Sequence, residues 1–218
     1  GTVEEVGPDV SAFKPGDEVY GMIGGVGGLQ GSLAEFASVD SDLLARKPAN
    51  LTMREAAALP LSVITAWEGL VDRANVQPGH TVLVHAGAGG VGHVVVQLAL
   101  AFGAKVFATI SDDKKSIVER FGATPINYKN TPVDQYVAEH THGEGFDIVY
   151  DTVDGTILDD SFAAIKVHTG HVVSCLGRGP HNLTPLSLRG ATYSGVFTLI
   201  PLLTGKGRRH RGDILRQA

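Results

Sequence analysis

The sequence predicts an α/β fold with a doubly wound parallel sheet, preceded by part of a small β domain. Short apolar strands alternate with amphipathic helices from about residue 81 onwards, and a glycine-rich segment joins the first of these strands to the first helix. With 218 residues, 43% hydrophobic content and 28 glycines, the chain is able to bury one core and part of another. A disordered or fibrous protein is therefore excluded.

Residues 1–50 carry short apolar segments at 2–6, 18–23 and 34–39, separated by glycine and proline turns, which is typical of small antiparallel strands. Because the chain opens directly into the first of these segments, we expect that upstream sequence is missing. The glycine-rich run 21–31 is interpreted as a mobile loop, since the residues after it alternate like a strand. A lid over a substrate is the alternative.

A helix is predicted from Thr52, which is a suitable N-cap with Glu55 three residues later, the signature of a capping box. The domain boundary is placed at this change in pattern. Residues 1–50 are then a partial domain and residues 51–200 a second domain. Residues 201–218 are expected to form a helical C-terminal segment.

Beyond residue 78, strands and helices alternate at the spacing of βαβ units. The expected strands are 81–85, 105–110, 125–128, 147–152, 171–176 and 192–197, and the expected helices are 90–102, 112–121 and 157–167. Two halves of three strands each fit a doubly wound sheet.

A glycine motif follows the first strand of this alternation. Gly87, Gly89 and Gly92 satisfy the pattern G-x-G-x-x-G and open a helix that is apolar on one face. Glycine is expected there because positive φ in a tight turn and close approach of a pyrophosphate both exclude a Cβ. A glycine-rich turn without a ligand is the alternative, which the strand before and the helix after disfavour. The motif in this context predicts a Rossmann-type dinucleotide-binding domain.

Four passages carry a resemblance to a known family. They are KPGDEVYG at 14–21, LPLSVITAWEGL at 59–70, HAGAGGVG at 85–92 and GATPINY at 122–128. In their order and spacing the chain resembles the zinc-independent quinone oxidoreductases, the zeta-crystallin-like group of the medium-chain dehydrogenase/reductase superfamily. The resemblance implies that residues 1–50 are part of a GroES-like substrate-side domain. It also implies a chain truncated at both ends.

The resemblance further assigns cofactor-binding positions, with the nicotinamide in the cleft between the two domains. Pyrophosphate contacts are expected from Ala88, Gly89, Gly90 and Val91, and Thr65 is expected near the phosphates and nicotinamide. Positions after the later strands are expected to line the nicotinamide and its ribose, because ligands lie at the carboxyl ends of such strands; they are Val153, Leu176, Gly177 and Phe197. For Phe197 an ordinary core aromatic is the alternative.

The segment after the second strand predicts NADP(H) rather than NAD(H). Enzymes that prefer NAD place a carboxylate about twenty residues into the motif, where this chain has Thr109. Ser111 and Lys114 and, by the family resemblance, Tyr128 are able to donate to a 2′-phosphate. Asp112 and Asp113 argue for NAD(H), although both also suit the first turn of a helix.

No metal is expected in this chain. The four-cysteine lobe of zinc-dependent relatives is absent, and the only cysteine, Cys175, lies in an apolar strand where a buried core residue is the expected role. His140 and His142 are the only neighbouring histidines, in a polar turn, and a zinc site there is disfavoured. The substrate's proton donor remains unassigned, because that part of the cleft would come from missing sequence.

Composition excludes other classes of function. The net charge of −5 gives no field that would attract nucleic acid, and the basic tail from Lys206 is interpreted as a solvated helix end. No apolar run is long enough to span a membrane and no signal pattern opens the chain, so we expect a cytoplasmic protein.

The predicted function is NADPH-dependent hydride transfer to a quinone or an α,β-unsaturated carbonyl compound. A zinc-type alcohol dehydrogenase, an enoyl-thioester reductase and a non-catalytic dinucleotide-binding protein are the alternatives. This fragment is expected to bind nucleotide without turnover. A homodimer is expected through the apolar segment from Thr192 to Phe197, which carries no charge or proline to block edge pairing.

Overall fold

The computed structural model describes residues 1–218, which divide into two compact units. One unit comprises Gly1–Ile64 with Thr198–Ala218, and the other comprises Thr65–Phe197. The break between these units lies inside helix α2 (Pro60–Trp67), whereas the sequence places a domain boundary near residue 50, and residues 201–218 group with the first unit. None of the helices has the length and apolar character that a membrane span requires.

The first unit is built around a two-stranded antiparallel sheet. Strand β1 (Val19–Gly21) pairs with β2 (Leu44–Arg46), with Tyr20 opposite Ala45, and a 3-10 turn η1 (Ser41–Leu43) precedes β2. The strand predicted at 34–39 is wrong, because this segment finds no partner strand and leaves the Phe36 side chain 72% exposed. Of the strand predicted at 2–6, only the bridge from Thr2 to Glu18 forms.

Helix α1 (Met53–Ala58) confirms the capping box. The Glu55 amide donates to Thr52 Oγ1 at 3.2 Å, and the Thr52 amide donates to Glu55 Oε2 at 2.8 Å. Two free amides of the first turn are thus satisfied reciprocally.

The two C-terminal helices, α8 (Ile200–Thr204) and α9 (Arg208–Gln217), belong to the first unit because α9 packs on the small sheet. The Tyr20 hydroxyl donates to the Leu215 carbonyl at 2.7 Å, and Arg216 donates to the Leu44 carbonyl at 3.0 Å. A Cβ at Gly212 would lie 2.6 Å from the Asp42 carbonyl oxygen, so glycine permits this close packing. The basic tail is therefore only partly solvated, since Arg211 is buried.

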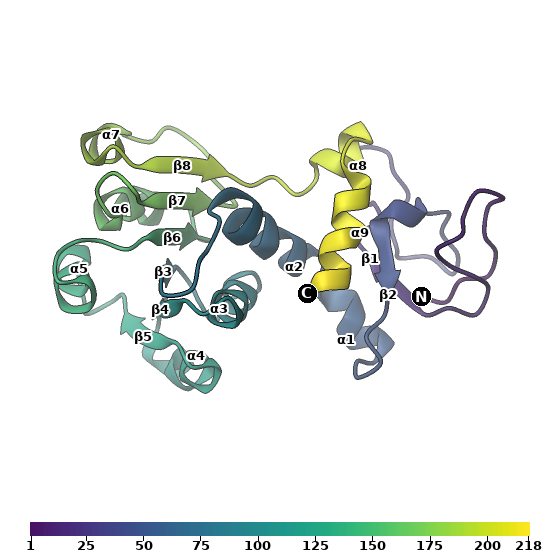
Figure 1. Ribbon diagram of the computed structural model, residues 1–218, viewed down its shortest axis with the longest axis horizontal. Helices are drawn as coiled ribbons and strands as arrows, with labels where there is room; N and C mark the ends of the chain where they lie inside the picture. The colour runs from purple at the N-terminus through teal and green to yellow at the C-terminus, as the bar shows by residue number, and fades with distance from the viewer. The chain divides into compact units, whose positions relative to one another are not determined.

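The second unit is a six-stranded parallel sheet in the order β5-β4-β3-β6-β7-β8 (Figure 1). Its strands are β3 (Thr81–Val84), β4 (Lys105–Ile110), β5 (Thr124–Asn127), β6 (Ile148–Asp151), β7 (His171–Ser174) and β8 (Thr192–Gly195). Every neighbouring pair is parallel. The predicted doubly wound sheet is confirmed, with two three-stranded halves that meet at β3 and β6.

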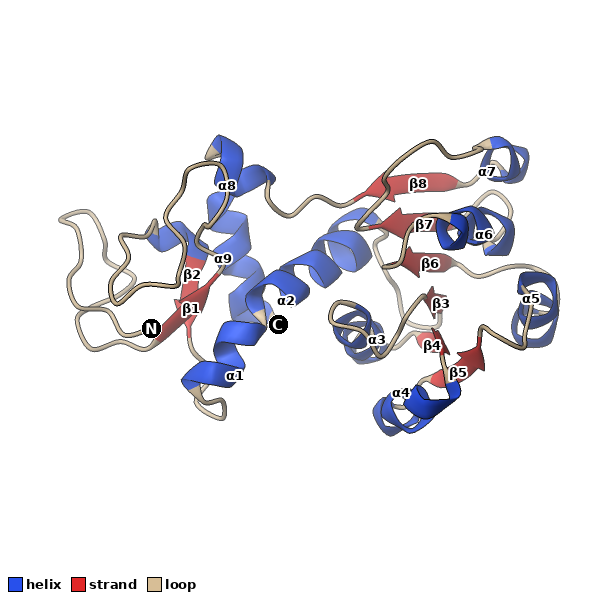
Figure 2. Ribbon diagram, turned by 180° about the vertical axis from the view of Figure 1, so that it is seen from behind, coloured by secondary structure: helices blue, strands red, loops and turns tan.

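Helices cover both faces of this sheet (Figure 2). Alternate strand residues face opposite layers, so that Val82 and Val84 pack with one cluster and Leu83 with the other. The first cluster includes residues of α3 (Gly92–Ala101), α4 (Lys115–Phe121) and the π-helix η2 (Glu68–Arg73). The second includes residues of α5 (Val133–Thr141), α6 (Thr156–Ala164) and α7 (Thr184–Arg189).

Helices α5 and α7 were not predicted. Helix α5 packs on the second cluster through the deeply buried Tyr136, with Val133 and Val137 beside it, while the short helix α7 contributes Leu186 to the same cluster. In α5 the helical period is short, with Val133, Tyr136 and Val137 at i, i+3 and i+4, and in α7 the helix is only six residues long.

Candidate functional site

The carboxyl ends of the six parallel strands form one edge of the second unit. Strands β3 and β6 are neighbours at the centre of the sheet, and the helices that follow them, α3 and α6, belong to opposite layers. After these two neighbouring strands the chain therefore continues to opposite faces of the sheet, which leaves a crevice position between them at the carboxyl edge. In doubly wound sheets such a point is where ligands bind.

The glycine motif makes a tight turn from β3 into α3. The Gly89 amide donates to the Ala86 carbonyl at 2.8 Å, and a Cβ at Gly92 would lie only 2.2 Å from that same carbonyl oxygen. A Cβ at Gly87 would lie 2.5 Å from the Cβ of Ala108 on β4. Glycine is thus required by close packing. The expected positive φ is found instead at Ala86, whose φ is 52°.

This turn leaves backbone donors at the start of α3. The amides of Ala88, Gly90 and Val91 donate to no acceptor in the protein, and α3 has no side-chain cap. Free amides at a helix N-terminus, reinforced by the helix dipole, form an anion site. Three of the four residues predicted to hold a pyrophosphate are thus the ones with free amides, and the fourth, Gly89, shapes the turn.

The residue predicted at the ribose position does not reach the edge. Thr109 is buried, and its hydroxyl oxygen accepts from the Ala86 amide at 3.1 Å and lies 3.2 Å from His85 Nδ1. Strand β4 continues to Ile110, so Ser111 is the first residue beyond it. Thr109 supports the glycine turn.

Two of the predicted phosphate donors converge on one carboxylate. Ser111 Oγ donates to Asp113, and Lys114 Nζ lies 3.7 Å from the other oxygen of Asp113. The hydrogen bond from Ser111 holds the pKa of Asp113 below its usual range. Asp112 accepts instead from the Asn127 side-chain amide at 2.6 Å. Tyr128 follows β5 and is half exposed.

The predicted nicotinamide-side residues follow β6, β7 and β8. Val153, Leu176 and Phe197 are 43%, 40% and 53% exposed, respectively, so none of them is a core residue and the core alternative for Phe197 is wrong. Gly177 lies in the left-handed region with φ of 45°, which favours glycine.

Thr65 begins the second unit and is buried. Its carbonyl accepts a 2.7 Å hydrogen bond from the Tyr150 hydroxyl on β6. A Cβ at Gly69 would lie 2.4 Å from that hydroxyl oxygen, so the absence of a side chain at Gly69 lets Tyr150 reach Thr65. The structure thereby ties Thr65 to a strand of the ligand-binding edge.

Sequence reasoning missed two buried polar residues at this edge. The imidazole of His85 is 3% exposed and its Nε2 has no hydrogen-bond partner in the protein. Burial lowers the pKa of His85 to about 4, against the opposing charge of Asp151. Asp151 itself is fully buried at the end of β6. Its only signal in the sequence is an acidic residue that closes an apolar strand.

The six-stranded parallel sheet and the glycine turn from β3 into α3 define a Rossmann-type α/β domain, in which the N-terminus of α3 is open at the carboxyl edge of the sheet. A family model described as zinc-binding dehydrogenase matches residues 90–205, more than half of the chain. The chain belongs to this family, and the predicted membership of the medium-chain dehydrogenase/reductase superfamily is confirmed.

Similar proteins share the whole length of this chain. An alcohol dehydrogenase superfamily protein from Novosphingobium aromaticivorans is 60% identical with a TM-score of 0.97, covering 100% of this chain and 66% of its own. The mycobacterial protein Rv1454c, solved in complex with NADPH, is 32% identical with a TM-score of 0.81, covering 100% of this chain and 69% of its own. Quinone oxidoreductases and enoyl reductases are among the other solved structures that resemble it.

Among curated proteins, 2-methylene-furan-3-one reductase from Solanum lycopersicum is 44% identical over 165 residues, which are 70% of this chain and 39% of the relative. The chain spans less than half the length of the curated relatives it matches.

The residues of this chain do not fit a zinc ion. No group of three or more histidine, cysteine, aspartate or glutamate side chains is arranged to hold a metal. His140 stacks near Phe107, with ring centroids 4.9 Å apart. Burial raises the pKa of the Cys175 thiol to about 11, which disfavours the thiolate that zinc binding requires.

Proposed function

We propose that this chain binds NADPH and is the cofactor-binding part of an oxidoreductase that reduces a quinone or an α,β-unsaturated carbonyl compound. The observation that carries the proposal is the set of free amides at Ala88, Gly90 and Val91. They lie where the chain diverges between β3 and β6, and a pyrophosphate supplies the negative charge that such amides stabilise.

The reduction of a quinone or an unsaturated carbonyl compound is proposed for the whole protein, because this chain spans only part of the length of its relatives. Three similar proteins support the proposed reaction: the quinone oxidoreductase of Pseudomonas syringae, the 2-methylene-furan-3-one reductase of Solanum lycopersicum, and Rv1454c in complex with NADPH. A reduced nicotinamide supplies a hydride when it is bound. The role of this chain is then to hold the dinucleotide and to keep water from it, with the exposed apolar side chains of Val153, Leu176 and Phe197 suited to cover the nicotinamide.

The proposed preference for NADPH depends on three residues after β4. In the free protein Asp113 engages Ser111 and Lys114 together. A 2′-phosphate would compete with Asp113 for the same two donors, because a phosphate offers more negative charge and more acceptor oxygens than a carboxylate. Asp113 consequently moderates the preference without removing the donors.

We expect Lys114→Glu to weaken NADPH binding by about tenfold or more and NADH binding by less than about threefold, since the lost charge faces only the 2′-phosphate. Asp113→Asn should change the ratio in the opposite direction, because it removes the negative charge that competes with a 2′-phosphate for Ser111 and Lys114. Fluorescence titration with each reduced cofactor measures the two dissociation constants.

Lys115→Glu is the matched control, because Lys115 pairs with Glu119 at 3.7 Å along α4 and is not engaged by Asp113. It should leave the NADPH to NADH ratio within about twofold of the parent. A parent protein that binds neither nucleotide would overturn the proposed function. A ratio that Lys114→Glu does not change would overturn the assignment of the 2′-phosphate site.

We also propose a homodimer through the free edge of β8, which is the last strand of the sheet. The amides of Thr192 and Val196 donate toward β7, so by alternation the amide of Ser194 also faces β7 and that of Gly195 faces the open edge. Proline at Ser194 would damage the sheet itself. Gly195 is the suitable position, since a Cβ there approaches no atom closer than 3.9 Å.

We expect Gly195→Pro to shift the protein from dimer to monomer in sedimentation velocity while its thermal stability stays close to the parent's, because proline removes an edge donor without removing a bond to β7. Ser194→Pro should instead lower stability. A dimer that persists in Gly195→Pro would contradict pairing through this edge.

A further inference from the structure

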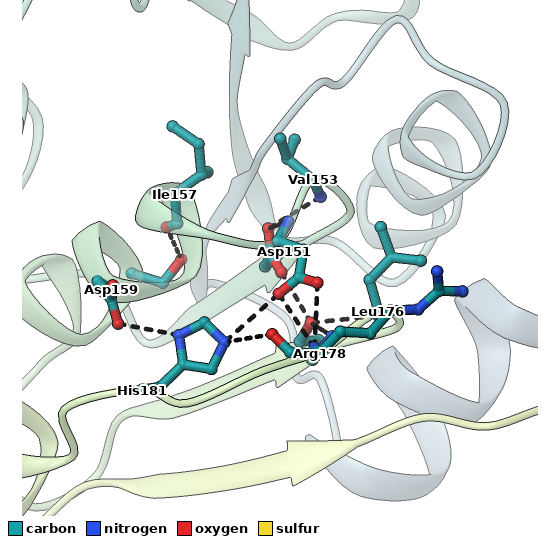
Figure 3. A network of polar contacts seen from close by, with 11 residues as sticks. Asp151, Val153, Ile157, Asp159, Leu176, Arg178 and His181 are labelled. Carbon is teal, nitrogen blue, oxygen red and sulfur yellow. Dashed lines mark hydrogen bonds and ion pairs between the residues drawn. The ribbon is translucent and has the colours of Figure 1, made fainter.

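We propose that Asp151 is a positioning residue for the nicotinamide: its single buried carboxyl group fixes both loops that form the nicotinamide-side wall. The inference rests on the proposed function, which assigns that wall to the ends of β6 and β7. Figure 3 shows Asp151 between Val153 and Leu176, the exposed residues of the two loops.

One oxygen of Asp151 organises the loop after β6. Asp151 Oδ1 accepts from the Val153 amide at 2.9 Å and from the Asp154 amide at 3.0 Å. These bonds hold Asp154 in the left-handed region, with φ of 78°. Such a backbone is unfavourable for a residue with a Cβ, so it requires the surrounding contacts to hold it.

The other oxygen organises the loop after β7 through a serine. Ser174 is buried, and its hydroxyl donates to Asp151 Oδ2 at 2.7 Å. The same hydroxyl oxygen accepts from the Leu176 amide at 3.3 Å and from the Gly177 amide at 3.1 Å. Asp151 therefore fixes the direction of the Ser174 hydroxyl, and Ser174 fixes the second loop.

Only a side chain that accepts hydrogen bonds on both sides satisfies this arrangement. An asparagine presents an acceptor on one side and an NH₂ donor on the other. With its NH₂ toward Ser174, the serine oxygen meets three donors and its own proton loses an acceptor. With the amide turned round, the NH₂ meets the Val153 and Asp154 amides. Either orientation releases one loop, which explains a buried acid at a site where burial of charge is costly.

A further contact joins the two loops directly. The Asp154 carboxylate accepts from the Arg178 amide at 3.0 and 3.2 Å, and His181 lies 3.5 Å from Asp154 and 3.0 Å from Asp159 of α6 (Figure 3). The loop after β6, which Asp151 holds, thus also binds the segment that follows Gly177. A change at Asp151 is therefore expected to disturb both loops of the nicotinamide-side wall and to leave the glycine turn after β3 in place.

The test compares two nucleotides that differ only in the nicotinamide: NADPH and 2′-phospho-ADP-ribose. In Asp151→Asn and in Ser174→Ala, NADPH affinity should fall by about tenfold while the affinity for 2′-phospho-ADP-ribose changes by less than about twofold. The fluorescence anisotropy of the bound nicotinamide should fall as well. Amide hydrogen exchange should become faster at Leu176 and Gly177 in both variants, which reports the loops without any ligand.

Asp147→Asn and Ser161→Ala are matched controls in the same unit. Asp147 lies just before β6, at the opposite end of the strand, where it accepts from Thr81 and Lys166, and Ser161 donates within α6 to the Ile157 carbonyl. They should preserve the parent's ratio of the two affinities. A parent that binds neither nucleotide defeats the proposed function and this inference together. A parent that binds both, with variants that lose both equally or lose neither, defeats the inference alone.

Discussion

Gly92→Ala is expected to lower the free energy of unfolding by about 3 kcal/mol and to weaken NADPH binding by more than about a hundredfold. The added Cβ would lie 2.2 Å from the Ala86 carbonyl oxygen and 3.1 Å from the Cα of Gly87. Both obstacles are backbone atoms of the turn, so the turn and the N-terminus of α3 must move apart. The free amides of Ala88, Gly90 and Val91 would then lose their common direction.

Gly90→Ala is the matched control, two residues earlier in the same motif. A Cβ at Gly90 meets no atom within 4 Å and its φ lies outside the left-handed region, so the free energy of unfolding should stay within about 0.5 kcal/mol of the parent's. Chemical denaturation with and without NADPH measures both effects. Equal stability of the two variants would show that the contact between α3 and the turn has room to relax.

The central strands of the parallel sheet, β3, β4, β6 and β7, were predictable because most of their residues are buried on both faces. Strand β4 was predicted with both ends correct at Lys105–Ile110, and the order of the strands follows from the two halves. Such strands form short apolar runs that no turn residue interrupts. The first unit lacks this signal, because its strands span three residues each and depend on partners far away in the chain.

The break between the two units differs from the boundary expected from the sequence for the same physical reason. The capping box at Thr52 correctly marks the start of a helix, but local capping carries no information about which core that helix joins. The contact that places α9 in the first unit, from Tyr20 to Leu215, spans 195 residues. Periodicity within one segment does not reveal such a contact.

The site was predictable where its chemistry is in the backbone and less so where it is in buried side chains. The glycine spacing located the free amides, although the cause proved to be close packing and not positive φ at the glycines. Thr109 illustrates the limit, since its place in the sequence suits a ribose contact but its side chain supports Ala86. Asp151 depends on Ser174, 23 residues further along, and no local pattern links the two.

The stability of the second unit should depend on pH through His85. Burial of the imidazole lowers its pKa from 6.5 to about 4, because burial disfavours the charged form more than the charge of Asp151 favours it, and Nε2 has no partner in the protein. The unfolded chain therefore binds a proton near pH 6.5 while the folded chain resists until about pH 4. The unfolded state binds more protons within this window, so the free energy of unfolding falls as the pH falls.

Across that pH window, His85 lowers the free energy of unfolding by about 3 kcal/mol. Below the window His85 is protonated in both the folded and the unfolded state, so it contributes no further change. In His85→Asn this part of the pH dependence should disappear, although the smaller side chain lowers stability by an amount that does not vary with pH. Asparagine keeps a polar atom close to Thr109, so the glycine turn stays supported.

The exposed His142 is the matched control, and His142→Asn should keep the parent's slope of unfolding free energy against pH. Urea denaturation at half-unit steps from pH 7.5 to pH 4 measures the three slopes. A His85→Asn slope that equals the parent's would mean that the imidazole gains a proton in the folded state as readily as in the unfolded chain.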